Sequence, residues 1–470
     1  MTSHLSLKNQ GHRSILKHKK TEMKFQYPKV RRDETVSDTL HGRKVNDPYR
    51  WLEDMDSKET KQFVTEQNQL TRDFIEKCTL KDKIQKKASE MYSYPKVSSP
   101  MKVANKYFFM QNSGLQAHSV LYGQDTLDSE PRVILDPNTW SADGGKALSA
   151  AGDIPAFQFS SDGKYLAYFV TEGGSDWATV KFLNVETLQE YPDALVNCKF
   201  VSAAWARDNS GVFYTRFDNV SRTDAGATAN NLNQKVYFHR LGDKQDKDVL
   251  IAEFPEMPEC MLLVRMTDCG NYLVLLLVVP THTKLCVIDL TSQPSQIKGK
   301  LQTTDLLPYF DNKTMNEYVT NVGTTFVIKT NENASNTKLI SVDLKNNTKE
   351  NVKTLVAESE DSVLNWAKAG AKDKLILCYS KDVKDTLIIH DLATGKKLSQ
   401  LDLDIGTIQS VSSNMKDDLI FITYLSFLRP GAIYTCNLSD GKYEVKMFKE
   451  SKIPGFNADD FAVKQGVLQQ

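Results

Sequence analysis

The chain has 470 residues, of which 40% are hydrophobic and 25% are charged, and its 59 basic and 59 acidic side chains cancel. This composition is typical of a soluble globular protein of about two to four domains. It excludes an electrostatic preference for nucleic acid or for an anionic membrane, and no apolar run is long enough to span a bilayer.

Residues 1–22 differ from the rest of the chain. They carry five basic side chains before the first acidic residue, Glu22, and they lack the continuous apolar stretch of a secretory signal. We expect a disordered basic extension here, upstream of a second start at Met23. A mitochondrial presequence is the alternative.

The seven cysteines are scattered along the chain. They form no C-x-x-C pair and have no zinc-like spacing to a histidine, so we expect free, mostly buried thiols and no metal site. Free thiols indicate a reducing compartment, and we therefore predict a cytoplasmic protein. No nucleotide-binding or calcium-binding motif is present, so we expect no cofactor.

The first regular pattern is helical and runs from Ser57 to about Met91. Asp56 and Ser57 are good N-caps, and Glu59 follows Asp56 at the spacing of a capping box. Two apolar stripes at helical spacing predict two amphipathic helices that end before Pro95.

After Pro100 the apolar period changes to 2, and one unit then recurs. Each unit has a strand rich in aromatic and β-branched residues, a polar turn and a partner strand. The seven strand openings lie at Lys106, Lys164, Gly211, Asn271, Thr324, Lys374 and Asp418. Their spacing of 44 to 60 residues suits a four-stranded blade with its loops and predicts a seven-bladed β-propeller. A pair of β-sandwiches, the competing fold, does not explain the fixed period.

No catalytic constellation is visible in these repeats. The nearest match to a nucleophile elbow, Gly173-Gly-Ser-Asp-Trp, ends in Trp177 instead of glycine and reads as a turn between two strands. None of the eight histidines stands in a recognisable base position. His239 and His390 alternate within strands, and we expect them to be satisfied structurally or solvated.

Several stretches, taken in chain order, resemble the prolyl oligopeptidase family of serine endopeptidases. The strongest is Asp47-Pro-Tyr-Arg-Trp-Leu-Glu-Asp, and the resemblance extends from Met23 to about Gln465. Further stretches are Tyr27-Pro-Lys-Val-Arg-Arg-Asp-Glu-Thr, Gly174-Ser-Asp-Trp, Asn231-Leu-Asn-Gln-Lys-Val-Tyr, Tyr318-Val-Thr-Asn and Asp382-Val-Lys-Asp-Thr-Leu-Ile-Ile-His-Asp-Leu.

The resemblance implies a seven-bladed propeller joined to an α/β-hydrolase domain with a Ser-Asp-His triad. In the family the N-terminal segment belongs to the hydrolase domain, and the propeller gates access of short proline-containing peptides. We therefore expect a basic extension at 1–22, a helical segment of the peptidase domain at 23–97, a mainly β propeller at 98–462 and a tail at 463–470.

The sequence departs from the family after Asp459-Asp-Phe-Ala-Val-Lys-Gln, where it reads Gly-Val-Leu-Gln-Gln. The hydrolase strands, the triad, the oxyanion tyrosine and the proline pocket are not in it. We expect a truncated chain with no catalytic residues, inactive alone. A stand-alone propeller that binds the full-length enzyme or another partner is the alternative, and complementation by a separate hydrolase domain is a third possibility.

Two propeller residues match family positions that face the substrate, namely Phe200 and Met261. Ordinary propeller packing is the competing interpretation for each. The loop Pro280-Thr-His-Thr is shorter and less polar than its family equivalent, so a substrate contact there is in doubt. We also expect Tyr49 and Trp51 to be partly exposed or to pack onto the propeller, because their implied partner is the hydrolase domain.

Overall fold

The computed structural model describes residues 25–149, 155–218, 232–291, 297–309 and 313–466. The predicted extension at 1–22 and the last four residues of the predicted tail at 463–470 lie outside these ranges. The chain divides into two compact units, Met1–Lys83 and Ile84–Gln470, with the boundary inside helix α2.

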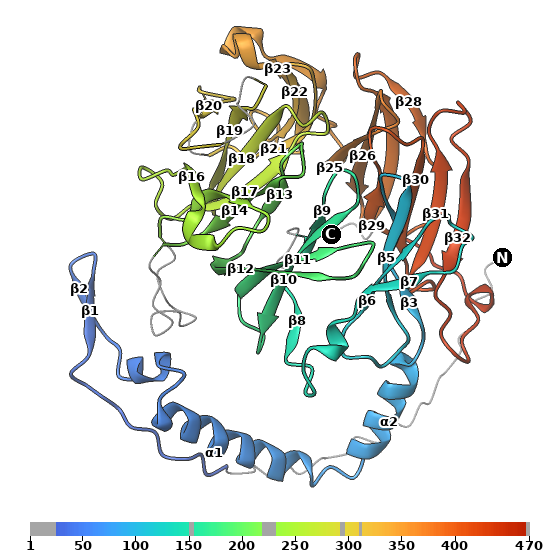
Figure 1. The fold of residues 1–470 in the computed structure, drawn as a ribbon. Helices are drawn as coiled ribbons and strands as arrows, with labels where there is room; N and C mark the ends of the chain where they lie inside the picture. Colours follow the sequence, from blue (N-terminus) through green and yellow to red (C-terminus); the bar gives the residue numbers. More distant parts are fainter. Residues whose placement is uncertain (1–24, 150–154, 219–231, 292–296, 310–312, 467–470) are drawn as a thin grey trace, which may run out of the picture. The chain divides into compact units, whose positions relative to one another are not determined.

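The N-terminal unit contains two short strands and a long helix (Figure 1). Its elements are β1 (Ser37–Leu40), β2 (Arg43–Asn46), the 3-10 helix η1 (Arg50–Glu53) and α1 (Lys58–Ile75), and α2 (Lys81–Tyr92) follows. Ser57 caps α1 by accepting a hydrogen bond from the Thr60 backbone N–H. The predicted Asp56–Glu59 capping box is therefore wrong, and Glu59 instead binds the Arg31 guanidinium at 2.9 Å.

The N-terminal unit has almost no buried interior. Thr60 is the only buried residue among those described in this unit. Tyr49 is 38% exposed and receives a hydrogen bond from Arg32, while Trp51 lies under the Arg31 guanidinium and edge-on to Phe63. The expectation that Tyr49 and Trp51 are partly exposed is confirmed.

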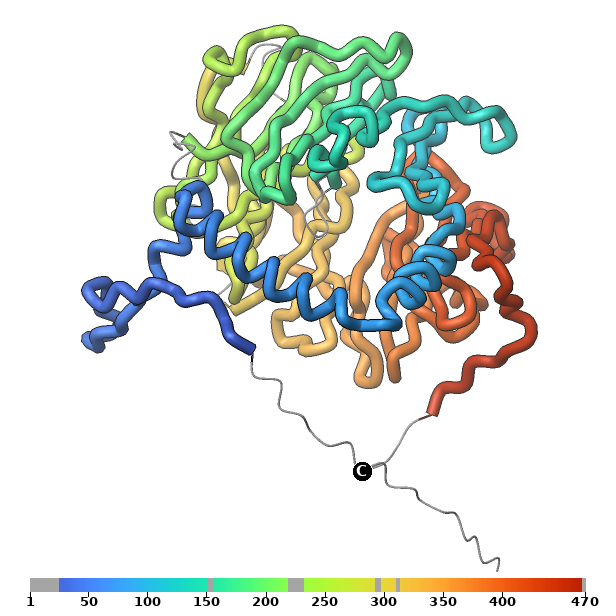
Figure 2. Tube along the Cα trace, turned by 90° about the horizontal axis from the view of Figure 1, so that it is seen from below, coloured from blue at the N-terminus to red at the C-terminus, as the bar shows by residue number. Residues whose placement is uncertain are grey.

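The second unit is a seven-bladed β-propeller, as predicted (Figures 1 and 2). Blades 1 to 7 are antiparallel sheets that follow one another along the chain. Blade 1 contains β3 (Lys96–Val97), β4 (Met101–Val103), β5 (Lys106–Asn112), β6 (Val120–Gln124) and β7 (Arg132–Leu135). Blade 2 contains β8 (Lys146–Leu148), β9 (Phe157–Phe159), β10 (Tyr165–Glu172), β11 (Trp177–Asn184) and β12 (Glu190–Lys199), and η2 (Pro137–Thr139) precedes it.

The other five blades each have four strands. Blade 3 contains β13 (Ala203–Trp205), β14 (Gly211–Arg216), β15 (Lys235–Arg240) and β16 (Val249–Ala252), with η3 (Gln245–Lys247). Blade 4 contains β17 (Met261–Met266), β18 (Tyr272–Val279), β19 (His282–Asp289) and β20 (Thr304–Asp305). Blade 5 contains β21 (Asn316–Val322), β22 (Thr325–Thr330), β23 (Lys338–Asp343) and β24 (Lys353–Val356), with η4 (Leu344–Asn346) and η5 (Lys349–Asn351).

Blade 6 contains β25 (Val363–Gly370), β26 (Lys374–Lys381), β27 (Lys384–Asp391) and β28 (Lys397–Gln400). Blade 7 contains β29 (Thr407–Ser412), β30 (Leu419–Leu425), β31 (Ala432–Asn437) and β32 (Val445–Glu450), and η6 (Ala458–Asp460) follows it. His282 opens β19, so its predicted place in a loop is wrong.

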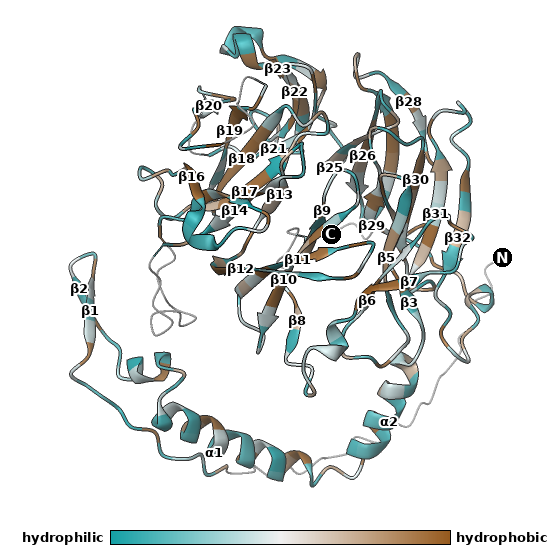
Figure 3. Cartoon of the chain, in the orientation of Figure 1, coloured by the Kyte–Doolittle hydropathy of each residue, from teal (hydrophilic) through white to brown (hydrophobic). Residues whose placement is uncertain are grey.

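Buried apolar side chains lie between the blades. The middle strands carry most of the apolar colour in Figure 3, whereas the turns are largely hydrophilic. Six clusters of buried residues join blade 1 to 2, 2 to 3, 3 to 4, 4 to 5, 5 to 6 and 6 to 7. Burial of this kind is the main favourable contribution to folding and holds the ring together.

The ring closes differently between blades 7 and 1, which lie side by side (Figure 1). Within the described residues, no strand from one end of the chain joins the sheet at the other end. Among the described residues, this junction has no buried cluster like the other six. Its contacts include a Ser99–Thr423 hydroxyl pair and a Lys102–Asp417 ion pair, each at 2.5 Å, and an edge-on contact of Tyr107 with Phe421. Asp417 of blade 7 is thus partly buried in its contact with Lys102 of blade 1.

Candidate functional site

The up-and-down order of the strands in each blade distinguishes the two ends of the propeller. First strands of neighbouring blades contact one another, as in β13–β17 and β21–β25, so the first strand of each blade is innermost. Because the strands alternate in direction, the loop between the second and third strand lies at the same end as the passage to the next blade. We call this end of the propeller the connection end.

Phe200 lies at the connection end, directly after β12. It is partly buried and has a positive φ of 49°, a conformation that is uncommon for a residue with a side chain. The chain turns here to leave blade 2 and enter β13 of blade 3. Such strain persists only where the surrounding contacts fix the backbone.

Met261 lies at the same end, as the first residue of β17 in blade 4, and is also partly buried. Its Cα is paired with that of Val278 on β18. The short loop Pro280–Thr281 joins β18 to β19, and its flanking residues Val279 and His282 are the last pair of the ladder. This tight hairpin is the form that the loop Pro280-Thr-His-Thr takes.

Two buried polar side chains bring the backbones beside Phe200 and Met261 together. Gln234, which is 3% exposed, donates from Nε2 to the Lys199 carbonyl at 3.1 Å and accepts from the Leu262 N–H at 2.7 Å. Ser202 forms a second link, since its hydroxyl donates to the Val264 carbonyl and accepts from the Val264 N–H. The segments that hold Phe200 and Met261 are thus fixed side by side.

Lys199 contributes a buried cation to this corner of the ring. Its residue is 3% exposed, and its ammonium lies 5.7 Å from the Trp177 ring centroid and 5.5 Å from that of Phe200. An ammonium over aromatic faces is held by the negative charge of the ring faces. The arrangement packs the Lys199 side chain against the ring of Phe200.

Two cysteines adjoin the candidate residues but are poor nucleophiles. Burial raises the pKa of the Cys198 thiol far above its usual range, and burial raises the pKa of the Cys260 thiol to about 11. Only the thiolate is strongly nucleophilic. Cys198 and Cys260 therefore serve as packing residues beside Phe200 and Met261.

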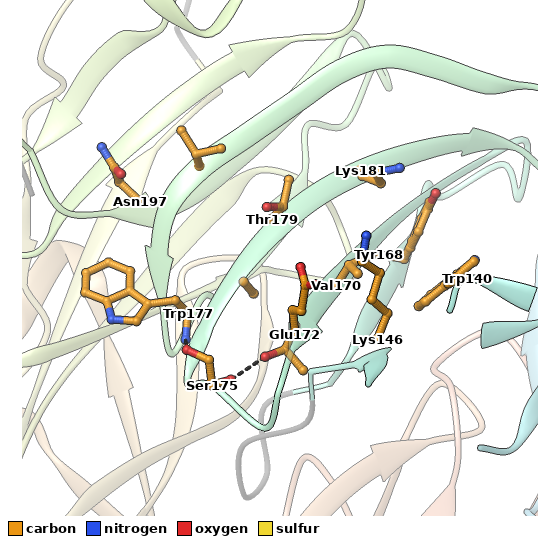
Figure 4. A pocket seen from close by; sticks show the side chains of 13 residues that line it. Trp140, Lys146, Tyr168, Val170, Glu172, Ser175, Trp177, Thr179, Lys181 and Asn197 are labelled. Carbon is orange, nitrogen blue, oxygen red and sulfur yellow. Dashed lines mark hydrogen bonds between the residues drawn. The ribbon is translucent and has the colours of Figure 1, made fainter. Parts of the chain in front are cut away.

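A cleft of about 520 Å³ opens on blade 2 over strands β10 and β11 (Figure 4). It is lined by aromatic and charged side chains, including Trp140, Lys146, Tyr168, Glu172, Trp177 and Lys181. Trp177 is shared between this cleft and the corner at Lys199, and its indole N–H is buried without a hydrogen-bond partner. The cleft does not include Phe200 or Met261.

The described residues contain no assembled hydrolytic triad. Gly173-Gly-Ser-Asp-Trp is a turn between β10 and β11, as predicted, and both glycines have positive φ. His239 is fully buried between Asp248 at 2.6 Å and Asp193 at 3.2 Å, and His390 bonds to the Gly395 carbonyl. Neither imidazole ring hydrogen-bonds to a serine hydroxyl. The expectation that both histidines are structurally satisfied is therefore confirmed.

Comparison with known proteins identifies this architecture. Residues 28–449 match the family model described as "Prolyl oligopeptidase, N-terminal beta-propeller domain". The chain belongs to the prolyl oligopeptidase family. The match begins within the N-terminal unit and ends in β32, so it includes the whole seven-bladed ring.

Curated relatives are peptidases of greater length. The chain is 31% identical to prolyl oligopeptidase ophP of Omphalotus olearius over 469 residues, with 93% of the chain and 61% of the relative covered. It is 28% identical to the prolyl endopeptidase of Elizabethkingia meningoseptica over 446 residues, with 94% of the chain and 59% of the relative covered. The chain thus spans about 60% of the length of these relatives.

Solved structures show the same fold. Prolyl oligopeptidase B of Galerina marginata, bound to a 35mer hydrolysis and macrocyclization substrate, superposes with a TM-score of 0.79. That comparison covers 93% of this chain and 62% of the other, at 25% sequence identity.

Sequence reasoning did not single out Gln234 or Ser202. Gln234 lies in the family-like stretch Asn231-Leu-Asn-Gln-Lys-Val-Tyr, and a polar residue directly before an apolar strand was the available signal. Its two partners lie 35 and 28 residues away along the chain, so the pattern alone could not reveal them.

Proposed function

We propose that this chain is the substrate-admitting propeller of a proline-specific serine endopeptidase. The proposal is supported by the family match over residues 28–449 and by Gln234, which bonds to the backbone of Lys199 beside Phe200 and of Leu262 beside Met261. In this role the propeller supplies the outer wall of the site, and a hydrolase domain supplies the triad.

The substrate class is proposed from membership of the family. Short peptides with an internal proline would enter, and Phe200 and Met261 would contact their apolar side chains. The chain by itself would cleave nothing, because its described residues bring no serine, histidine and carboxylate together. A proline pocket and an oxyanion hole would come from the hydrolase domain.

Methyl NMR of the full chain tests the proposal. The chain would be labelled on its methionine methyl groups, and the Met261 signal assigned by its loss in Met261→Leu. Titration with a hexapeptide that contains proline should shift this signal saturably, with weak affinity. Phe200→Ala should reduce the shift. The absence of any peptide-dependent shift at Met261 up to millimolar peptide would contradict the proposal.

A second candidate function is a binding module that associates with a hydrolase domain or a full-length relative. It is favoured by apolar side chains exposed at the connection end, where Phe427 is 96% and Val383 is 92% exposed. Leu115, Met315 and Leu232 are exposed at the same end, whereas Leu188 and Val322 are at the opposite end. Apolar side chains as exposed as Phe427 and Val383 at one end are typical of an interaction surface.

Sedimentation of the chain with a full-length relative distinguishes this second function. A mixed complex that is weakened by Phe427→Ser would support it. Two separate boundaries at micromolar concentration would contradict it. The exposed side chain of Val322 offers a matched control, because Val322→Ser changes an apolar residue at the opposite end.

The cellular setting is proposed from the thiols. All seven cysteines are free, and five of them are buried. We infer a reducing compartment such as the cytoplasm. No helix among the described residues is long and apolar enough to cross a membrane.

A further inference from the structure

Gln234 occupies a position where three blades meet. The residue belongs to blade 3 and lies directly before β15. Both the nitrogen and the oxygen of its side-chain amide form hydrogen bonds. The Nε2 group donates to Lys199 of blade 2, and the Oε1 atom accepts from Leu262 of blade 4. The side chain is 3% exposed, so water does not compete for these bonds.

The backbone around Gln234 is itself held in place. Asn233 has a φ of 60°, and its N–H donates to the Pro258 carbonyl at 2.7 Å. Pro258 lies three residues before Met261 on the passage into blade 4. The Gln234 side chain therefore starts from a fixed backbone position. It has little freedom to follow movements of Lys199 or Leu262.

The two bonds of Gln234 adjoin the two candidate site residues directly. Lys199 precedes Phe200, and Leu262 follows Met261. Within this corner only an uncharged side chain of this length, with one donor and one acceptor, satisfies both backbone groups. Leucine would leave a carbonyl and an N–H unpaired, and asparagine is shorter by one methylene.

We propose that Gln234 is a positioning residue, which sets the spacing between Phe200 and Met261 and so shapes the apolar wall that a peptide contacts. The inference rests on the proposed function for its peptide-binding consequence. The spacing itself is a property of the free chain.

The first experiment needs no ligand. The Met261 methyl signal is compared in wild type, Gln234→Leu and the matched control Asn316→Leu. Asn316 is an equally buried amide that links β21 to Thr283 and Thr330. It bonds to neither Lys199 nor Leu262, and strand β18 lies between Thr283 and Met261. We expect Gln234→Leu to shift or split the Met261 signal, and Asn316→Leu to leave it in place at a similar loss of thermal stability.

Gln234→Glu provides a rescue. A protonated carboxyl has the donor and the acceptor of the amide, whereas the ionised form has no donor. Burial favours the protonated form. Lowering the pH from about 8 to about 5 should therefore return the Met261 signal of this variant to its wild-type position, which a purely structural defect would not do.

Peptide titration completes the test. We expect Gln234→Leu to weaken binding of the proline hexapeptide about tenfold, and Asn316→Leu to leave the affinity within about twofold of wild type. A folded Gln234→Leu with unchanged Met261 signal and unchanged affinity would overturn the proposal. So would failure of Gln234→Leu, Gln234→Met and Gln234→Glu to fold, because Gln234 would then be a structural residue. If wild type binds no peptide while Gln234→Leu still moves the Met261 signal, the proposed function fails and the positioning role stands.

Discussion

His239 is a fully buried titratable side chain outside the candidate site. It is fully buried in β15, stacks on Phe182 of blade 2, and lies between Asp193 of blade 2 and Asp248 of blade 3. Burial alone would lower the pKa of His239, but hydrogen bonds and charges of Asp248 and Asp193 outweigh burial and raise that pKa. The imidazolium thus joins two blades.

The pH dependence of stability follows from this raised pKa. An unfolded histidine titrates near pH 6.5, so the stabilisation by His239 is complete below about pH 6.5. It is lost as the pH rises through the higher folded pKa. We expect His239→Gln to lower the free energy of unfolding by about 3–5 kcal/mol at about pH 6, because two carboxylates lose their cation. The difference should shrink toward about pH 9.

Urea unfolding of the propeller at the two pH values measures this effect. His390 is the control, because burial lowers the pKa of His390 and its neutral ring bonds to a carbonyl. Its influence has the opposite sign, since it reduces stability as the pH falls below about 6.5. An equal deficit of His239→Gln at both pH values would contradict the prediction.

At the residue scale, the sequence predicted which residues to single out better than it predicted which residues they contact. Phe200 and Met261 were named from the resemblance, and the structure places them at one end of the ring, with their substrate contact still a prediction. The partners of His239 lie 46 and 9 residues away, and no local pattern encodes that Asp193 of another blade faces its ring. Only the folded ring brings such groups together.

The helix α1 packs against no buried apolar core among the described residues of its unit. It has 18 residues, and Phe74 and Val64 are exposed on it. Ser57 caps it, and the Arg31–Glu59 ion pair and the Phe25–Phe74 ring contact flank it. An isolated helix of this length is marginal in water without an apolar partner.

We expect α1 to exchange its amide hydrogens much faster than the middle strands of the propeller. Local opening is easiest where few apolar contacts are buried. Hydrogen exchange followed by mass spectrometry measures this, with peptides from β18 as the internal reference because Leu273, Leu275 and Leu277 are fully buried there. Protection of α1 equal to that of β18 would contradict the prediction.

The same contrast explains which strands the sequence predicted. The predicted openings at Lys106, Asn271 and Lys374 lie at the middle strands β5, β18 and β26, which are apolar on both faces. The first and last strands were missed. β13 has three residues and β20 has two, and exposed side chains predominate in β28, so their patterns are too short or too polar to detect.

At the scale of the whole molecule, the junction of blades 7 and 1 differs from the other six, because no buried apolar cluster of described residues spans it. The Lys102–Asp417 pair there is partly buried, with side chains 31% and 17% exposed. The Lys381–Asp361 pair in blade 6 is far more exposed, at 52% and 64%. The two ion pairs therefore differ mainly in how buried their side chains are and in location. The Lys102–Asp417 pair joins blades 1 and 7, whereas the Lys381–Asp361 pair lies within blade 6.

We expect Lys102→Met to lower the free energy of unfolding by roughly 1–2 kcal/mol, between the values of an exposed pair and of a buried charged hydrogen bond. Amide exchange should also rise in β5 and β30, on both sides of the junction. Lys381→Met should change stability by less than about 0.5 kcal/mol, since exposed pairs contribute little. Equal effects of the two substitutions in urea unfolding would show that the junction has no special dependence on this pair.

In the part of the chain that the structure describes, blades 7 and 1 exchange no strand, and this bears on how such a chain can be rearranged. Every blade is wound from one uninterrupted stretch, and the ring begins at Lys96 and ends at Glu450, both at the connection end. The blade order is therefore cyclic in space although it is linear in the gene. A circular permutant that joins these two points and opens the chain between two other blades would keep every sheet intact. It would move the chain ends to a junction where an apolar cluster joins the two blades. The stability of ring closure could then be measured independently of where the chain begins and ends.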